Sequence, residues 1–454
     1  MQNIPEKRSL ADVPGGPVFL HSVGKNGALE RDEQKENQDN HKAADIGLYG
    51  FGKDREEVVE HRDGKLLGEE DEHRETLMME LTRLVQRRVR ESSWWERRGK
   101  DCAILSAAFG ALPAGFLLLS SSDWWCFLLG LFILGISHAM ITVKGTHLAS
   151  HGALSESPGW SNFLAIFFIE VCGSFSARVG VQAHVKMHHA HTNVIGLGDS
   201  STWKIPFLPR GVYLFLAPLA VPIITPLVAF AHLKGHSLLL VLRTVLCVCL
   251  GFLSQFYLLM SVSGLCFGSA LLIMHLSRAM FSLPYIHVNI FQVRERASTH
   301  LGDASSLGLG FDKKALIGCY ESVSERTDVM HAQSSGMCRR HVLGYHIGLS
   351  MFSVSRRPKR IFQMTHGVLN LPRNPLLDWT FGHSLISCHV EHHLFPALSD
   401  NMCLKVKPLV SQFLKQKQLP YHQDGYISRL RLFYRRYTEL MVLAPPITEL
   451  VGVQ

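Results

Sequence analysis

Histidines gathered in three short clusters are the residues of this sequence best suited to chemistry. Each cluster contains histidines three or four positions apart, which places two imidazoles on one face of a helix, where both can reach the same ion. One such pair is an ordinary feature of a helix surface, but three clusters together predict a metal site. The clusters are GTHLASHGAL with His147 and His151, HVKMHH with His184, His188 and His189, and HVEHH with His389, His392 and His393.

The number of imidazoles favours two ions. A catalytic zinc typically takes about three protein ligands and a water, whereas two ions with about four ligands each would use the whole set. Imidazole suits iron, copper and zinc alike, so spacing does not identify the metal. His287, in YIHVNIF, is a ninth candidate ligand. Nearby histidines without a partner at ligand spacing are expected to be structural or to support the ligands: His138, His191, His275 and His383.

Four apolar stretches are long enough to cross a bilayer core of about 30 Å. They form two hairpins whose turns, Ser121–Asp123 and Ser261–Gly264, carry neither Lys nor Arg. Because the outer ends of the first hairpin are basic, the positive-inside rule predicts that these ends and the histidine clusters are cytosolic. The predicted spans are Cys102–Ser120, Trp124–Val143, Leu238–Met260 and Leu265–Pro284.

Two other apolar segments are predicted to lie in the membrane interface. Phe163–Cys172 is short and carries Glu170. Tyr213–Ala231 contains three prolines, and three missing amide donors are costly for a span that faces lipid. If the clusters share one site, an even number of crossings must separate them, which excludes a single crossing by either segment.

The N-terminal region changes character near Leu77. Residues 1–75 are polar and mixed in charge, which predicts a disordered tail. Helical periodicity then leads into a basic run with Trp94 and Trp95, so residues 76–100 are predicted to form an amphipathic interfacial helix. The net charge is +8, and the basic residues cluster beside apolar segments. This placement favours anionic lipid over nucleic acid as a partner. The ten cysteines lack the paired spacing of a disulfide framework.

The motifs HLASH, HVKMHH and HVEHHLFP, with paired spans between the second and third, resemble the three histidine boxes of the membrane fatty acid desaturases. The resemblance covers roughly Ser92–Gln292 and His346–Val453. The desaturase domain is predicted over residues 101–292 and 346–446, with 447–454 as a C-terminal tail. It implies an all-α membrane protein with four transmembrane helices in two hairpins and a cytosolic helical cap that holds a diiron centre. The implied reaction uses O2 to introduce a double bond into a fatty acyl chain.

By the same resemblance, the eight histidines of the boxes and His287 ligate the two irons. At two positions this chain differs from the family pattern, and these differences limit which residue roles the resemblance implies. Stearoyl-type relatives have Asn four positions before the histidine that corresponds to His287, where this chain has Leu283, so ligation of the second iron is not fixed by the resemblance. Front-end relatives have Gln where this chain has His389. The resemblance therefore does not predict the position of the double bond.

The resemblance also implies partners. Electrons come from a cytochrome b5 type donor, which some relatives carry as an N-terminal haem domain with an HPGG motif. Here Pro14, Gly15 and Gly16 follow Val13 within a polar tail, so the donor is expected to act in trans. The acyl substrate, expected as acyl-CoA, would bind through its methylenes, each contributing about 0.8 kcal/mol on burial. The expected location is the endoplasmic reticulum, with the catalytic face and both termini cytosolic.

Basic residues near the boxes could meet an acyl carrier, but a solvated or lipid-facing role is expected for Lys144, Lys186 and Arg178. Three other readings remain open. A diiron hydroxylase would share the whole site, and only product analysis separates it from a desaturase. A metal transporter predicts ionisable residues within the spans, which are mostly apolar here. The third reading is a catalytically silent metal-binding membrane protein.

Residues 293–345 are polar, rich in Ser and Gly, and without sustained periodicity. They look inserted relative to the desaturase pattern and are predicted to form a disordered loop. Retained non-coding sequence or a regulatory loop are the alternatives. Because His300, His331 and His341 lack paired spacing, they are not expected to bind the irons.

Overall fold

The computed structural model describes residues 68–194, 207–284 and 357–443, apart from the side chains of 68–76, 217, 280 and 439–443. All of them belong to one compact unit, Phe51–Gln454. Some predictions fall outside these residues and stay predictions. They concern the tail over residues 1–67, the ligand His287, the insertion 293–345 with its three histidines, and the tail 447–454.

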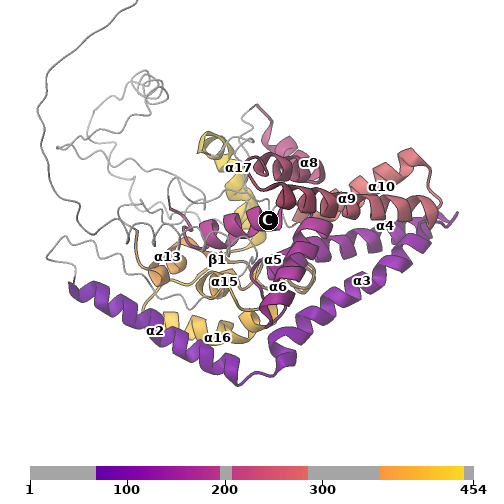
Figure 1. The fold of residues 1–454 in the computed structure, drawn as a ribbon. Coiled ribbons are helices and arrows are strands. Elements are labelled where there is room, and N and C mark those ends of the chain that lie inside the picture. The colour runs from indigo at the N-terminus through magenta and orange to yellow at the C-terminus, as the bar shows by residue number, and fades with distance from the viewer. Residues whose placement is uncertain (1–67, 195–206, 285–356, 444–454) are drawn as a thin grey trace, which may run out of the picture. The chain divides into compact units, whose positions relative to one another are not determined.

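Helices dominate the described residues, which confirms the predicted all-α class (Figure 1). The exception is a short parallel pair of strands, β1 (Leu369–Asn370) and β2 (His422–Gln423). The N-terminal elements are α2 (Gly68–Arg90), η1 (Trp95–Gly99), α3 (Lys100–Leu118), α4 (Trp124–Ala139), η2 (Met140–Gly145), α5 (Thr146–Ser150), α6 (Pro158–Ala165), η3 (Ile166–Cys172), α7 (Ala177–Val181) and η4 (Gln182–His188). The later helices are α8 (Arg210–His232), α9 (Leu238–Ser261), α10 (Phe267–Ala279), η5 (Met280–Ser282), α13 (Arg360–Gly367), α14 (Pro375–Phe381), α15 (His389–Leu394), α16 (Asp400–Gln416) and α17 (Tyr426–Leu443).

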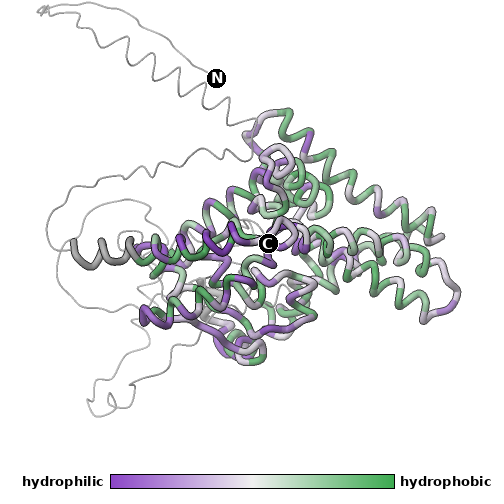
Figure 2. Tube along the Cα trace, turned by 90° about the horizontal axis from the view of Figure 1, so that it is seen from below, coloured by the Kyte–Doolittle hydropathy of each residue, from purple (hydrophilic) through white to green (hydrophobic). Residues whose placement is uncertain are grey.

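The first predicted hairpin is formed by α3 and α4, which pack against each other. Asp123 begins α4 by accepting a hydrogen bond from the amide of Cys126 at 2.9 Å. The two helices approach closely because glycines face each other: a Cβ on Gly130 would lie 3.0 Å from the carbonyl oxygen of Gly115. Small residues permit such contacts between membrane helices. Figure 2 shows hydrophobic residues concentrated along these apolar helices.

The predicted number of four membrane spans is not confirmed by the described residues. Within the described residues, three helical stretches are long and apolar enough to cross a membrane, Trp95–Leu118, Trp124–Ser150 and Leu238–Ser261, or up to five if two bent pairs each count as one span. The predicted span Leu265–Pro284 is not among them, because α10 ends at Ala279 and passes into the 3-10 turn η5. The ring of Pro284 would clash with the carbonyl of Met280 in a regular α-helix. Four spans are therefore not confirmed.

The two segments expected in the interface are the bent ones. The chain turns by 110° between Pro158–Cys172 and Ala177–His188, and by 58° between Arg210–Leu216 and Pro218–His232. A proline in a helix interior is a common cause of such a kink, and Pro218 lies at the second bend. Bending does not fix the depth of these segments, so their position in the interface stays a prediction.

A partly buried ion pair holds the first bend onto α9. Glu170 in η3 is fully buried and accepts hydrogen bonds from Arg243 at 2.7 and 3.2 Å and from Thr244 at 3.1 Å. The carboxylate also accepts from the amide of Ala177, which starts α7, at 3.1 Å. Glu170 and Arg243 each interrupt an apolar segment, and here they compensate each other next to the second histidine cluster.

The predicted amphipathic helix exists as α2, but it begins at Gly68 and ends at Arg90. Its apolar stripe, Leu77, Leu81 and Val85, is buried against residues of α13, α15 and α16. The stripe is therefore covered by protein, because α16 presents a matching apolar face, and an interfacial position of residues 76–100 stays a prediction. Trp94 and Trp95 remain exposed, as expected for side chains at headgroup depth.

Replacing Gly251 with Ala should destabilise the fold. A Cβ at this position of α9 would lie 1.9 Å from the carbonyl oxygen of Val171 in η3, so the helix must move away from the segment that carries Glu170. Overpacking of this kind costs about 1–3 kcal/mol. Thermal unfolding of the purified protein in detergent should show a lower midpoint. Gly110→Ala in α3 is the matched control, since nothing lies within 4 Å of its Cβ, and equal midpoints for both variants would contradict the assigned contact.

Candidate metal centre

The three histidine clusters lie at breaks or ends of helices, where the chain can aim several side chains at one point. The first follows α4 through the π-helical turn η2 into α5. The second occupies the π-helical turn η4, and the third forms the short helix α15. π-helical turns are rare and often occur at functional sites, because the extra residue per turn redirects side chains. Here two of them precede or contain candidate ligands.

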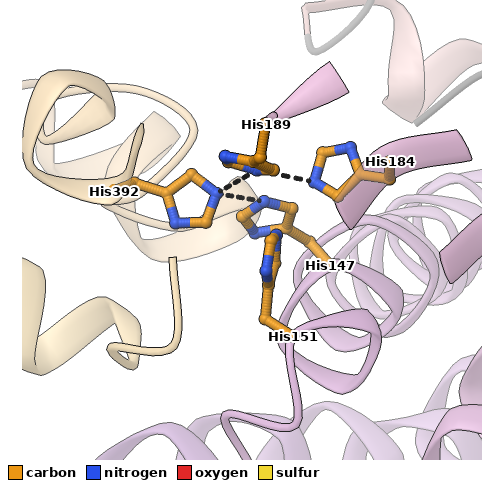
Figure 3. A group of neighbouring side chains, drawn as sticks. All are labelled: His147, His151, His184, His189 and His392. Carbon is orange, nitrogen blue, oxygen red and sulfur yellow. Dashed lines mark hydrogen bonds between the residues drawn. The ribbon is translucent and has the colours of Figure 1, made fainter. Parts of the chain in front are cut away.

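Five buried histidines from all three clusters form one group (Figure 3). One ring nitrogen from each lies within 4.8 Å of the others. The Nε2 atoms are in close contact, at 3.0 Å between His147 and His392, 3.1 Å between His392 and His189, and 3.3 Å between His189 and His184. His151 completes the group, and its Nε2 is buried without a hydrogen-bond partner.

A second group overlaps the first and consists of His188, His189 and His393. The Nε2 atoms of His188 and His393 are 3.3 Å apart. His389 extends this group, since its Nε2 lies 3.1 Å from that of His393. All eight histidines of the three clusters thus lie in two adjoining groups that share His189, which is the arrangement expected for two neighbouring ions.

The protons on two of these rings can be located from their partners. His389 Nδ1 lies 3.0 Å from the carbonyl oxygen of Ser384, which can only accept, so Nδ1 carries the hydrogen. His393 Nδ1 lies 3.2 Å from the hydroxyl of Thr192, whose own hydrogen is donated to the carbonyl of His188 at 2.7 Å. His393 Nδ1 must therefore donate as well. In the neutral rings, both Nε2 atoms carry lone pairs and face each other at 3.1 Å.

Facing lone pairs repel unless a cation lies between or beside them. Two imidazole nitrogens about 2.1 Å from one ion at a tetrahedral angle are separated by about 3.4 Å, close to the contacts in both groups. Burial and the neighbouring imidazoles hold the pKa of His392 well below its ordinary range, so this ring is neutral and able to bind a metal. The donor set therefore fits two transition-metal ions.

A series of buried polar side chains contacts His147 through its Nδ1 atom. Its Nδ1 lies 3.2 Å from the hydroxyl of Ser384, and this hydroxyl donates to Asp400. Asp400 forms an ion pair with Lys144 at 3.0 Å, and Lys144 forms a second one with Asp101 at 3.1 Å. Lys144 was expected to be solvated or lipid-facing. That prediction is wrong, because its side chain is 1% exposed and lies between two carboxylates.

The third cluster is anchored through Glu391, which lies between its histidines in sequence. Tyr421 donates to this buried carboxylate at 2.6 Å and Asn370 donates at 3.0 Å. Burial and the adjacent Glu391 raise the pKa of Tyr421, so the phenol keeps its proton and remains a donor. Asn370 also accepts from the amide of Val390 at 2.9 Å. The strand pair β1–β2 thus fixes the orientation of α15.

The remaining predicted histidines are outside both groups, as expected. His191 contacts the carbonyl of Met187 at 3.3 Å, and His383 lies 3.5 Å from Asp378. His138 lines a cavity beside η2 together with the buried Arg278. His275 is on α10, outside both groups. Sequence reasoning missed Ser384 and Asp400, because isolated polar residues far from each other in the chain carry no spacing signal.

The profile of the fatty acid desaturase family matches residues 122–425, a stretch that contains all three histidine clusters. The chain belongs to the fatty acid desaturase family, and the resemblance drawn from its histidine boxes is confirmed.

Individual relatives are similar over most of their length. Fatty acid desaturase 6 of Bos taurus and that of Mus musculus are each 52% identical to this chain over 381 residues, which cover 84% of the chain and 96% of each relative. Fatty acid desaturase 6 of Homo sapiens is 51% identical over 380 residues, 84% of the chain and 92% of the relative. The match therefore covers nearly the whole of each relative.

Proposed function

We propose that this chain introduces a double bond into a fatty acyl chain, using two iron ions held by the histidines of the three clusters and by His287. One observation carries the proposal: eight histidines from three distant segments converge on two adjoining groups in a member of the fatty acid desaturase family. Iron is favoured over zinc because the reaction is a redox reaction, and zinc has no redox chemistry.

The reaction balance defines what the site must provide. Two hydrogen atoms leave adjacent methylenes of the acyl chain, and O2 is reduced to two waters with two further electrons and two protons. Bound iron would supply the oxidising power that removes hydrogen from an unactivated carbon. The protein supplies neutral, buried imidazoles held in fixed orientations, and it keeps bulk water away from the centre: seven of the eight clustered histidines are at most 8% exposed.

The electron donor is proposed to be a cytochrome b5 type protein that acts in trans, and the substrate is proposed to be acyl-CoA. The polar composition of the N-terminal tail supports a separate donor, because such a segment is unsuited to enclosing a haem. Membrane lipid is the surrounding solvent for the apolar helices, where exposed leucines and phenylalanines are frequent on α8 and α9.

The proposed location is the endoplasmic reticulum membrane, with the histidine clusters and both termini on the cytosolic side. The turn Ser121–Asp123, which carries neither Lys nor Arg, and the basic residues before α3 support this orientation. Exposed Trp124 and Trp125 at the turn, and exposed Trp94 and Trp95 at the other end of the hairpin, support this proposal, since exposed tryptophans are typical interfacial anchors.

The function is tested by expressing the chain in desaturase-deficient yeast supplied with a panel of saturated and monounsaturated fatty acids. We expect a new unsaturated product in the lipid profile and about two irons per purified chain. His188→Ala and His392→Ala should each lower iron content and abolish the product, because each removes a donor from one group. His236→Ala, at an exposed turn between α8 and α9, should match the wild type. A hydroxylated product, or zinc with little iron, would refute the proposal.

The orientation is tested with epitope tags in the same cells. Tags at Gly198 and at the C-terminus should be stained after permeabilisation of the plasma membrane alone, because an even number of crossings separates the clusters. A tag in the Ser121–Asp123 turn should need permeabilisation of internal membranes and serves as the lumenal control. Lumenal staining at Gly198 would break the shared-site arrangement.

A further inference from the structure

Ser384 occupies a junction between the two histidine groups. It lies in the turn before α15 and is 1% exposed. Its hydroxyl contacts Nδ1 of His147, which belongs to the first group, at 3.2 Å. Its carbonyl oxygen accepts from Nδ1 of His389, which extends the second group, at 3.0 Å. One residue therefore contacts a candidate ligand of each ion, through its side chain for one and its main chain for the other.

The direction of the hydrogen bonds follows from Asp400. An ionised carboxylate can only accept, and Asp400 Oδ1 accepts from both the amide and the hydroxyl of Ser384. The single hydroxyl hydrogen is thereby used, so Ser384 Oγ can only accept from His147 Nδ1–H. That leaves the lone pair of His147 on Nε2, the atom that faces His392 at 3.0 Å. The chain Asp400–Ser384 thus selects the tautomer that can bind a metal.

Lys144 keeps Asp400 ionised. Burial alone would raise the pKa of Asp400, but the ammonium of Lys144 and the donors of Ser384 hold it below its ordinary value. Asp400 is also the first residue of α16, where the helix dipole favours a negative charge. Lys144 in turn pairs with Asp101, whose other oxygen accepts from the amide of Asn401 at 3.1 Å.

The charge of the Asp101–Lys144–Asp400 cluster is opposite in sign to that of the two proposed metal ions. Asp101, Lys144 and Asp400 are each at most 2% exposed, and with both carboxylates ionised they carry one net negative charge. Buried charge is costly unless it is compensated. Neutral imidazoles contribute no charge to balance two cations, whereas a net negative group connected to His147 through one serine does.

We propose that Lys144, Asp400 and Ser384 are positioning residues that fix the tautomer of His147 and so set the metal affinity of the first histidine group. The proposal rests on the metal centre proposed above and concerns one of its two ions. A purely structural role would be different: the ion pairs would hold α3, η2 and α16 together, and metal affinity would follow overall stability.

Ser384→Ala separates these roles in the full-length chain in detergent. Alanine keeps the main-chain amide for Asp400 and the main-chain carbonyl for His389, and removes only the hydroxyl. In titrations of metal-free protein with Co2+, followed by visible absorption, we expect one ion to bind about 10–100-fold more weakly and the other to bind as in the wild type. Ser384→Thr, which retains a hydroxyl, should restore the affinity. Wild-type affinity for both ions in Ser384→Ala would overturn the proposal.

Two single variants with the same net charge test the direction of the chain. Asp101→Asn leaves Lys144 paired with Asp400, and Asp400→Asn leaves Lys144 paired with Asp101. Each removes one carboxylate and retains Lys144. Asp101→Asn should keep the affinity of both Co2+ ions, and Asp400→Asn should lose it for one, because an amide at this position can donate to Ser384 and no longer fixes its hydroxyl. Equal affinities in the two variants would show that only the ion pairs matter.

The wild-type titration separates failure of this inference from failure of the proposed function. If the wild type binds no Co2+, the proposed metal centre itself is wrong. If the wild type binds two ions and Ser384→Ala does too with equal affinity, the centre stands and the positioning network is refuted. Should Ser384→Ala fail to fold, the charge-matched variants Asp101→Asn and Asp400→Asn decide the question, with unfolding midpoints of the metal-free proteins as the measure of stability.

Discussion

Imidazole lone pairs that face each other in a buried site are the constraint on which the rest of this structure depends. Hydrogen bonds from Nδ1 of His389 and His393 leave both Nε2 atoms with lone pairs at 3.1 Å, a contact that a nearby cation would stabilise. Burial increases the cost of this arrangement, because buried polar atoms need a partner. A metal ion bound by both nitrogens would turn the repulsion into attraction, and the fold around the site holds the rings in place.

Each histidine cluster is held by a different polar contact that crosses the fold. Ser384 and Asp400 orient the first cluster, the Glu170–Arg243 pair fixes the bend before the second, and Glu391 ties the third to Tyr421 and the strand pair. The ligands are therefore placed by buried carboxylates on otherwise apolar elements. Such carboxylates are costly when unpaired, so the loss of one partner should disturb the site and the fold together.

The histidine clusters and three of the long apolar helices could be predicted from sequence, because spacing and hydropathy are local signals. The burial of Lys144 could not be predicted, since a lysine at the end of an apolar span ordinarily reaches water. Its partners, Asp101 and Asp400, are about three hundred residues apart and have no shared pattern. The cover of the α2 stripe could not be predicted either, because periodicity does not reveal which surface an apolar face contacts. The fourth predicted span is interrupted after Ala279 by the 3-10 turn η5, where hydropathy alone predicted a continuous helix to Pro284.

The most direct test of the two-ion centre is an experimental structure of the iron-loaded protein with anomalous scattering measured on both sides of the iron absorption edge. We predict two iron peaks, one within the group formed by His147, His151, His184, His189 and His392, and one beside His188, His189, His389 and His393. The two peaks should be close neighbours, because His189 belongs to both groups. A single peak, peaks away from these histidines, or density that lacks the iron edge would contradict the account.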